Sequence, residues 1–386
     1  MCCPEAGLEG MERFLCIAGC ARGQAFLRAC AELGVKPTLL TLDSLQDAAW
    51  PREALEDLAT MPSGLSRGQI LNTVSWMARG RLFHRVVALD EGDLLTAAAL
   101  REHMRIPGMG LTTAGYYCDR LAMWISARES GFAVPRFCRV LNYDELREFM
   151  ERVQAPWRLI PRVSGPEQPE RLIGDPEQLW RVLEQLGDLQ SHFLLEEALE
   201  GERFTVESIV SESRVVFSVV HRHACLQAGG ARLIETVDRS SLGWMELTAL
   251  NGGLAPSLGM VRGVTQVRFL RSHADGRYVF NGISAGVGCN GTDMATEAAT
   301  ELSLWKEWAR LEVAHLRGQD YVPAEWFGRY ALCLQGMEPQ LQADDPALAG
   351  VEVAFREQSG GQAALVLRSA FHEKLARLPD ALANQR

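Results

Sequence analysis

The N-terminal third alternates short apolar runs with segments of helical period, and this alternation limits the possible folds more than any other feature. RFLCIAGC predicts a buried strand, GQAFLRACAELG predicts a helix that closes on Gly34, and KPTLLTL predicts the next strand. A strand, a helix and a strand in this order are typical of a parallel sheet. The chain therefore begins as an α/β domain.

The same pattern recurs before a break in the chain. In HRVVALDEGDLLTAAALREHM, an apolar strand ends in Asp90 and Glu91, and an alanine-rich helix follows. IPGMG then interrupts the pattern with proline and glycine. We expect the first domain to end there, at about residue 110.

From about residue 111 the pattern changes to α+β. DRLAMWISARESG and YDELREFMERV predict helices on either side of the extended FAVPRFCRVLN. Antiparallel strands are predicted at FLLEEALEGERFTVESIV and RVVFSVVHRH, at TQVRFLRSHADGRYVFNGI, and in the C-terminal hairpin VEVAFREQSGGQAALVLRS. ELSLWKEWARLEVAHLRG predicts an amphipathic helix.

Composition narrows the possible partners and location. A formal net charge of −10 disfavours nucleic acid, so a small molecule, a protein partner or a second copy of the chain is expected. The chain has neither a signal peptide nor an apolar run of the roughly 18 to 20 residues that cross a bilayer, which predicts a cytoplasmic protein. The ten cysteines show no paired zinc-site spacing. The start codon stays open between Met1 and Met11, because Met11 directly precedes the first strand.

Lysine is nearly absent from the chain. Lys36, Lys306 and Lys374 are the only lysines among 39 basic residues. A codon bias towards arginine explains the surface as a whole. Even so, no lysine is available for chemistry between Lys36 and Lys306.

Several short motifs, in a specific order, connect the chain to a known family. They are VVALDEGDLLTAAALRE before IPGMG, then CDRLAMW, GFAVPRF, PWRLIPR, LLEEALEG with TVESIV, GVTQVRFL, DGRYVF and LWKEWARLEVA. In this order they resemble the bacterial ATP-grasp carboxylate–amine ligases, which include biotin carboxylase, over nearly the whole chain. The resemblance implies an N-terminal α/β domain (1–110), an ATP-grasp domain (111–318) with a lid at about 138–200, and a C-terminal α+β extension (319–386).

The resemblance also implies a chemistry. In such ligases lysines hold the phosphates of ATP and carboxylates hold Mg²⁺, while an acyl phosphate forms for attack by an amine. The hinge that contacts adenine and ribose is kept, with Glu196 and Glu197 in LLEEALEG and Glu207 in TVESIV. Ordinary exposed or capping carboxylates explain these three residues equally well.

The phosphate-binding positions depart from the family. Arg120 replaces one lysine and keeps its charge, whereas Ile160 replaces the second and cannot bind a phosphate. In place of the flexible glycine-rich loop the chain has VSGPEQPERLIG, with acidic side chains and two prolines. Arg120 and Arg162, with the three glutamates of the hinge, are the candidate cofactor-binding residues.

The metal-binding positions depart further. Arg268 replaces the first glutamate of the family, and the expected glutamate, asparagine and arginine are replaced by Asn281, Ile283 and Ala285. We therefore expect no metal site and no Mg²⁺, with ATP left as a candidate cofactor. A sharper hypothesis places the Arg268 guanidinium where Mg²⁺ would lie, with Arg271 beside it, so that it binds an anion without metal. A salt bridge that fills an unused pocket is the alternative.

Three functions follow from these residues. The leading hypothesis is a catalytically degenerate ligase homologue that acts as a binding or partner subunit in a biosynthetic pathway. The second is an active ligase that forms an amide-type bond through an acyl phosphate, using Arg120, Arg162 and Arg268 with relocated metal ligands. The third is a serine hydrolase built on Ser284, because residues 282–286 spell G-x-S-x-G and acidic residues and histidines follow.

Overall fold

The chain divides into two compact units. The computed structural model describes residues 11–163, 169–225, 232–326, 328–336, 348–359 and 362–379. The first unit consists of residues 1–114 and 305–323, and the second of residues 115–304 and 324–386. Within the described ranges, no helix combines the length and the apolar character of a membrane span.

The first unit is built on a parallel four-stranded sheet of order β3-β2-β1-β4. Its strands are β1 (Arg13–Ala18), β2 (Lys36–Leu42), β3 (Asp57–Met61) and β4 (Arg85–Ala88). Its helices are α1 (Gln24–Glu32), α2 (Arg67–Met77), α3 (Leu94–Met104) and most of α10 (Leu304–Leu316), while α4 (Leu111–Cys118) spans the division between the units.

Local sequence sets the limits of these helices, and apolar packing holds them to the sheet. Gly34 adopts a positive φ of 81° just after α1, as expected at a helix C-terminus. Ser66 and Gln69 form a capping box at the start of α2. Apolar side chains of α2 and α3 pack on β1 and β2 in one core. Helices α1 and α10 meet through Phe26 and Trp308, whose ring centroids lie 5.2 Å apart.

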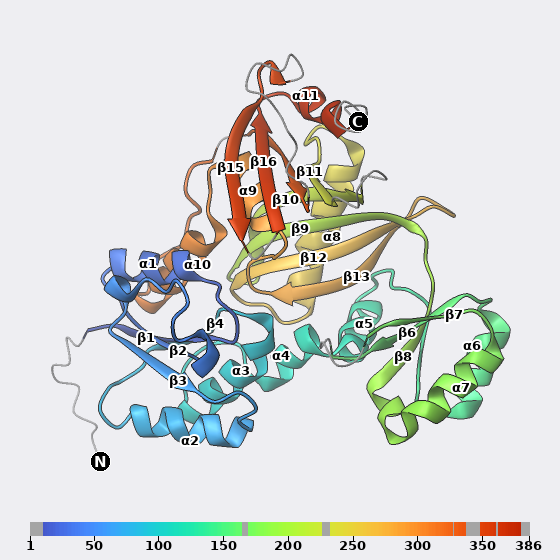
Figure 1. Cartoon of the computed structure of the whole chain (residues 1–386), viewed down its shortest axis with the longest axis horizontal. Helices are drawn as coiled ribbons and strands as arrows, with labels where there is room; N and C mark the ends of the chain where they lie inside the picture. The colour runs from blue at the N-terminus through green and yellow to red at the C-terminus, as the bar shows by residue number, and fades with distance from the viewer. Residues whose placement is uncertain are drawn as a thin grey trace. The chain divides into compact units, whose positions relative to one another are not determined.

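The second unit contains an antiparallel eight-stranded sheet, termed the broad sheet, of order β13-β12-β9-β10-β11-β14-β16-β15 (Figure 1). Its strands are β9 (Gly201–Ser211), β10 (Arg214–Cys225), β11 (Arg232–Thr236), β12 (Gly263–Ser272), β13 (Tyr278–Ala285), β14 (Tyr330–Gln335), β15 (Glu352–Ser359) and β16 (Gln362–Ser369). The β9–β10 turn is tight, because Glu212 and Ser213 both have positive φ angles.

Helices α8 (Leu242–Ser257) and α9 (Thr292–Thr300) pack against the broad sheet. Buried alanines of α9 lie against Ile234, Cys333 and Val366, which come from β11, β14 and β16. The short helix α11 (His372–Ala376) follows the last strand. Strands β14 and β16 thus share a core with β11 and α9.

The second unit also contains a small sheet of order β5-β8-β6-β7. Its strands are β5 (Phe137–Arg139), β6 (Trp157–Pro161), β7 (Arg171–Ile173) and β8 (Phe193–Glu197). Helix α5 (Arg120–Glu129) precedes it, and α6 (Tyr143–Arg152) and α7 (Pro176–Leu186) pack on it through one apolar core. Asn142 caps α6, and Asp175 caps α7 with Pro176 in its first turn.

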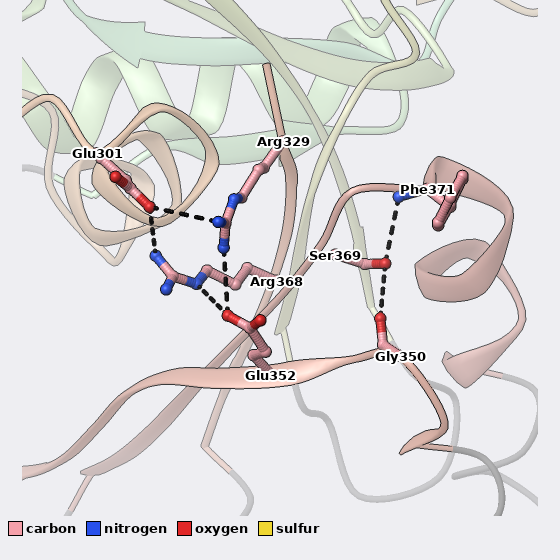
Figure 2. A network of polar contacts seen from close by, with 7 residues as sticks. All are labelled: Glu301, Arg329, Gly350, Glu352, Arg368, Ser369 and Phe371. Atoms are coloured by element: carbon pink, nitrogen blue, oxygen red, sulfur yellow. Dashed lines mark hydrogen bonds and ion pairs between the residues drawn. The ribbon is translucent and has the colours of Figure 1, made fainter. Parts of the chain in front are cut away.

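Four charged residues near the C-terminus form a closed ring, termed the C-terminal network (Figure 2). Arg368 donates to Glu301 at 3.1 Å and to Glu352 at 3.0 Å. Arg329 donates to Glu352 at 3.2 Å and pairs with Glu301 at 3.8 Å. Each arginine therefore faces two carboxylates, and the ring connects the end of α9 to β15 and β16.

The predicted combination of a parallel α/β sheet with antiparallel α+β parts is confirmed. The ranges 1–110, 111–318 and 319–386 stay a prediction, and of the two compact units the first includes residues 305–323. In that unit Glu312 of α10 pairs with Arg85 at 3.4 Å. Residues 330–369 supply three strands of the broad sheet. In the loop predicted over residues 163–174, residues 164–168 lie outside the described ranges.

Candidate functional site

A cavity of about 590 Å³ lies in the second unit, with walls from both of its sheets. Strands β9, β12 and β13 supply one wall, and β6 and β8 with the start of α5 supply the other. Its charged side chains are Arg120, Arg158, Glu170, Glu196, Glu197, Glu200, Arg203 and Arg268. Among them are Arg120, Glu196, Glu197 and Arg268, which the sequence singled out, and the predicted Asn281 also lines the cavity.

Glu196 is the most deeply buried carboxylate of the cavity wall, with 2% of its surface exposed. Strand pairing places Arg158 opposite it, and Arg158 Nε lies 3.2 Å from Glu196 Oε1. Arg158 also pairs with Glu170. Burial raises the pKa of Glu196 to about 7, and Arg158 and Arg120 oppose that shift. This carboxyl group therefore changes charge near neutral pH.

Glu197 is held by the arginine at the start of the small sheet. Its two carboxylate oxygens accept from the backbone N–H of Arg136 at 2.8 Å and from Arg136 Nε at 2.5 Å. Glu196 and Glu197 are thus both bound to arginines of the protein. The second carboxylate oxygen of Glu196, Oε2, is buried without a hydrogen-bond partner.

Arg120 begins helix α5, and its guanidinium carbon lies 5.9 Å from the centre of the Trp124 ring. Burial lowers the pKa of Arg120; Glu196 opposes this shift, and the positive charge of Arg268 adds to it. Over the part of the chain that the structure describes, Arg120 forms no ion pair within 4.0 Å of a carboxylate.

Arg268 is held between neighbouring strands of the broad sheet. Its Nη1 donates to Ser284 Oγ at 3.1 Å, across the β12–β13 pair. A Cβ atom on Gly282 would lie 2.8 Å from Arg268 Nη2, so the glycine leaves space for the guanidinium. Arg268, like Arg120, lacks a carboxylate ion pair within the described ranges.

Other predicted residues lie away from the cavity lining. Ile160 is fully buried in β6, and Ile283 is fully buried in β13. Ala285, at the end of β13, is 9% exposed. Arg162 pairs with Asp119, with Nη2 and Oδ2 2.5 Å apart, so its guanidinium is engaged beside the first turn of α5.

Glu207 lies deeper, under the loop between β13 and α9. Gln266 Nε2 donates to Glu207 Oε1 at 2.5 Å and also contacts Thr292 Oγ1 at 2.9 Å. Burial raises the pKa of Glu207 to about 7, while the hydrogen bonds from Gln266, Thr292 and the Gly288 backbone lower it. A Cβ on Gly288 would lie 2.2 Å from Glu207 Oε1. Glu207 therefore holds this loop to the sheet.

The serine hydrolase hypothesis has no support in the geometry. Ser284 lies inside strand β13, paired with Gln266 of β12, whereas a nucleophile elbow requires a sharp turn from a strand into a helix. The next helix, α9, begins only at Thr292. His372, one of the histidines that follow Ser284 in the sequence, lies 3.4 Å from Glu235. The G-x-S-x-G spelling is therefore a coincidence of sequence.

Several cavity residues were missed at the sequence level: Arg158, Glu170, Glu200, Arg203 and His273. Arg158 could have been found, because it lies in the motif PWRLIPR two residues before Ile160, and alternate residues of a strand share a face. The others depend on strand pairing across the cavity. Sequence alone does not give that pairing.

The arrangement favours an anion over a cation. Within the described ranges, no three His, Cys, Asp or Glu side chains are grouped as metal ligands. Magnesium needs several oxygen ligands around one point, and the carboxylates Glu196 and Glu197 are bound to arginines. The expected absence of Mg²⁺ from this wall stays a prediction. An anion fits, because Arg120 and Arg268 face the same cavity without carboxylate partners.

Solved structures with the same architecture cover almost the whole chain. An L-amino acid ligase from Bacillus licheniformis matches with a TM-score of 0.71 and 14% identity over 97% of each chain. The ADP complex of an N5-carboxyaminoimidazole ribonucleotide synthetase matches with a TM-score of 0.70 and 15% identity over 96% of each chain. The N5-carboxyaminoimidazole ribonucleotide synthetase of Thermus thermophilus has a TM-score of 0.67 and 19% identity, over 96% of this chain and 99% of that one.

Similarity at the sequence level is weaker. The L-arginine-specific L-amino acid ligase of Bacillus subtilis is 21% identical over 240 residues, which cover 60% of this chain. The matched region spans 58% of that ligase. No family model matches the chain.

Proposed function

From the ATP-grasp fold, which this chain has in common with carboxylate–amine ligases, we propose that it is a catalytically degenerate ligase homologue that serves as a binding or partner subunit in a biosynthetic pathway. One observation carries the proposal. Where the resemblance leads us to expect metal-binding glutamates, the cavity wall presents Arg268 and Asn281. A guanidinium cannot coordinate a metal ion, and an amide is a weak substitute for a carboxylate.

The phosphate-binding positions support the same conclusion. Transfer of a phosphoryl group needs cations that neutralise the charge developing on its oxygens. Ile160 is buried in β6, and Arg162 is neutralised by Asp119. Arg120 and Arg268 are the residues that would hold the phosphates of ATP, and Leu199, Leu270 and Val279 supply apolar surface in the same cavity. The protein is thus equipped to bind such a ligand more than to activate it.

A turnover assay tests the proposal. Purified protein is incubated with ATP, MgCl₂, a mixture of amino acids as acids and amines, and a coupled assay for ADP. We expect no ADP release above the rate without protein. Release that requires both a carboxylate and an amine would refute degeneracy.

The match over 97% of an L-amino acid ligase favours a second candidate, an active ligase that forms an amide-type bond. It would use Arg120 and Arg268 with metal ligands at new positions. The same assay decides between the two, because only this candidate predicts ADP and a new dipeptide or amide in equal amounts. Mass spectrometry of the reaction would identify that product.

A further inference from the structure

We propose that the cavity is a metal-independent clamp for a phosphorylated ligand, in which the Arg120 and Arg268 guanidinium groups together supply the positive charge. This inference rests on the proposed function, because it concerns the ligand of the same cavity. It adds the chemical class of that ligand and the absence of a divalent cation from its binding.

The position of Arg268 is set by its neighbours. Strand pairing places Arg268 beside Gly282, and Ser284 Oγ accepts from its Nη1 at 3.1 Å. A side chain at position 282 would meet Nη2 at 2.8 Å. The Ser284 hydroxyl therefore orients the guanidinium without neutralising its charge, and the absence of a side chain at Gly282 leaves space for it.

Arg120 supplies the second charge from the opposite wall. The Trp124 ring lies against its guanidinium, which orients the group but leaves its N–H donors available. Burial disfavours the charged form of Arg120, the charge of Glu196 favours it, and the charge of Arg268 disfavours it. Two like charges in one cavity repel each other, and a bound anion relieves that repulsion.

The third arginine of the inner wall shows the contrast. Arg158 is paired with both Glu196 and Glu170, so it has no excess charge to offer a ligand. Among the arginines that line the cavity, Arg120, Arg203 and Arg268 have no carboxylate ion pair within the described ranges, and the charges of Arg120 and Arg268 are coupled to each other. Together they present more N–H donors than the two oxygens of one carboxylate can accept. A phosphate or diphosphate group, with three or more oxygens, matches that donor set better.

The test uses calorimetric titration of the full chain with inorganic pyrophosphate and with ADP, in EDTA and in MgCl₂. We expect pyrophosphate and ADP to bind in EDTA at least as tightly as in MgCl₂. Succinate, a carboxylate dianion, should bind about tenfold more weakly than pyrophosphate. Arg268→Gln and Arg120→Gln should each weaken pyrophosphate binding about ten- to hundredfold. Arg277→Gln is the matched control, because Arg277 lies on the same β12–β13 hairpin with its charge on an exposed Asp275 pair.

Circular dichroism and thermal unfolding check that each variant is folded, and the two single variants give independent readings. Binding that requires Mg²⁺, equal binding by Arg268→Gln and wild type, or no binding of either ligand in either buffer would overturn the inference. ADP release in the turnover assay would overturn the proposed degeneracy while leaving metal-free binding intact. The two failures are therefore distinguishable.

Discussion

The cavity and the C-terminal network, both in the second unit, place the same side chain in opposite surroundings. In the network, Arg329 and Arg368 each face the carboxylates of Glu301 and Glu352, so the ring is electrically balanced (Figure 2). In the cavity, Arg120 and Arg268 line the same space and make no ion pair within 4.0 Å of a carboxylate in the described ranges, although Glu196 acts on Arg120 at longer range. The carboxylates of the network balance its arginines, whereas the proposed clamp needs an anion to balance Arg120 and Arg268. On that proposal, charge balance distinguishes arginines that stabilise the fold from arginines that bind a ligand.

The largest effect is expected when glutamates are introduced at the two positions where the resemblance predicts metal-binding glutamates. In Arg268→Glu/Asn281→Glu, the charge at position 268 is reversed, and metal-free pyrophosphate binding should fall more than about hundredfold. MgCl₂ should then restore part of the binding, because two carboxylates can hold the cation. Calorimetry in EDTA and in MgCl₂ measures both effects. Unchanged metal-free affinity would contradict the role of Arg268.

Glu207 provides a second comparison, because it is a buried carboxylate whose hydrogen-bond donors are neutral groups and not arginines. The pKa of Glu207 is raised by burial from 4.5 to about 7, so between these values the folded state binds more protons than the unfolded state. Stability then falls as pH rises from about 4.5 to about 7, and stays lower above it. Glu207→Gln should remove this loss and raise the free energy of unfolding by about 1 to 2 kcal/mol at about pH 8.

Urea unfolding at about pH 5 and about pH 8 measures the effect of Glu207→Gln. The gain should be largest at the higher pH. Glu196→Gln is an unsuitable control, since Glu196 lines the cavity. A variant that is less stable than wild type at both pH values would show instead that the charged hydrogen bond from Gln266 dominates.

A smaller change tests how closely the position of Arg268 is set. Gly282→Ala should displace the guanidinium, because the new Cβ would lie 2.8 Å from Nη2. The far end of a flexible side chain can move, so we expect about a tenfold loss of pyrophosphate affinity with a loss of stability below about 1 kcal/mol. Calorimetry and urea unfolding on one preparation measure the loss of affinity and the loss of stability, respectively. Wild-type affinity would mean that Arg268 has more freedom than proposed.

The smallest effect is expected in the network itself. Arg368→Gln removes two ion pairs that are partly exposed, with 27% of the Arg368 side chain accessible. We expect a loss of at most about 1 kcal/mol in unfolding free energy and no change in ligand affinity. Urea unfolding in low and high salt checks this, since the difference between variant and wild type should shrink as salt increases. A loss of ligand affinity would show that the two regions are coupled.

Local patterns predicted the elements well where period and end signals coincided. KPTLLTL matches β2 residue for residue, and the helix predicted to close on Gly34 ends as expected. The strands predicted at FLLEEALEGERFTVESIV and RVVFSVVHRH are joined where Glu212 and Ser213 adopt positive φ. The grouping of α10 with the first sheet was not predictable, because it depends on contacts such as Glu312 with Arg85, which are more than 200 residues apart.

For the site, order and resemblance singled out Arg120, Glu196, Glu197, Arg268 and Asn281, which the structure brings into one cavity. Sequence could not show which of their charges are balanced, because that depends on strand pairing. The pairing of β6 with β8 gives Glu196 its partner Arg158. The sequence also could not show that Glu207, a glutamate like Glu196, lies under the β13–α9 loop.

The route of the chain between the two units has a consequence for synthesis on the ribosome. The segment 305–323 belongs to the first unit, and strands β14 to β16 of the second unit follow it. The first unit is therefore incomplete until residue 323 has been made, by which time most of the second unit is already available to fold. A break at residue 304 would leave both halves unfinished, the first without α10 and the second without three strands of its broad sheet. Two fragments divided there should become stable only when they are produced together.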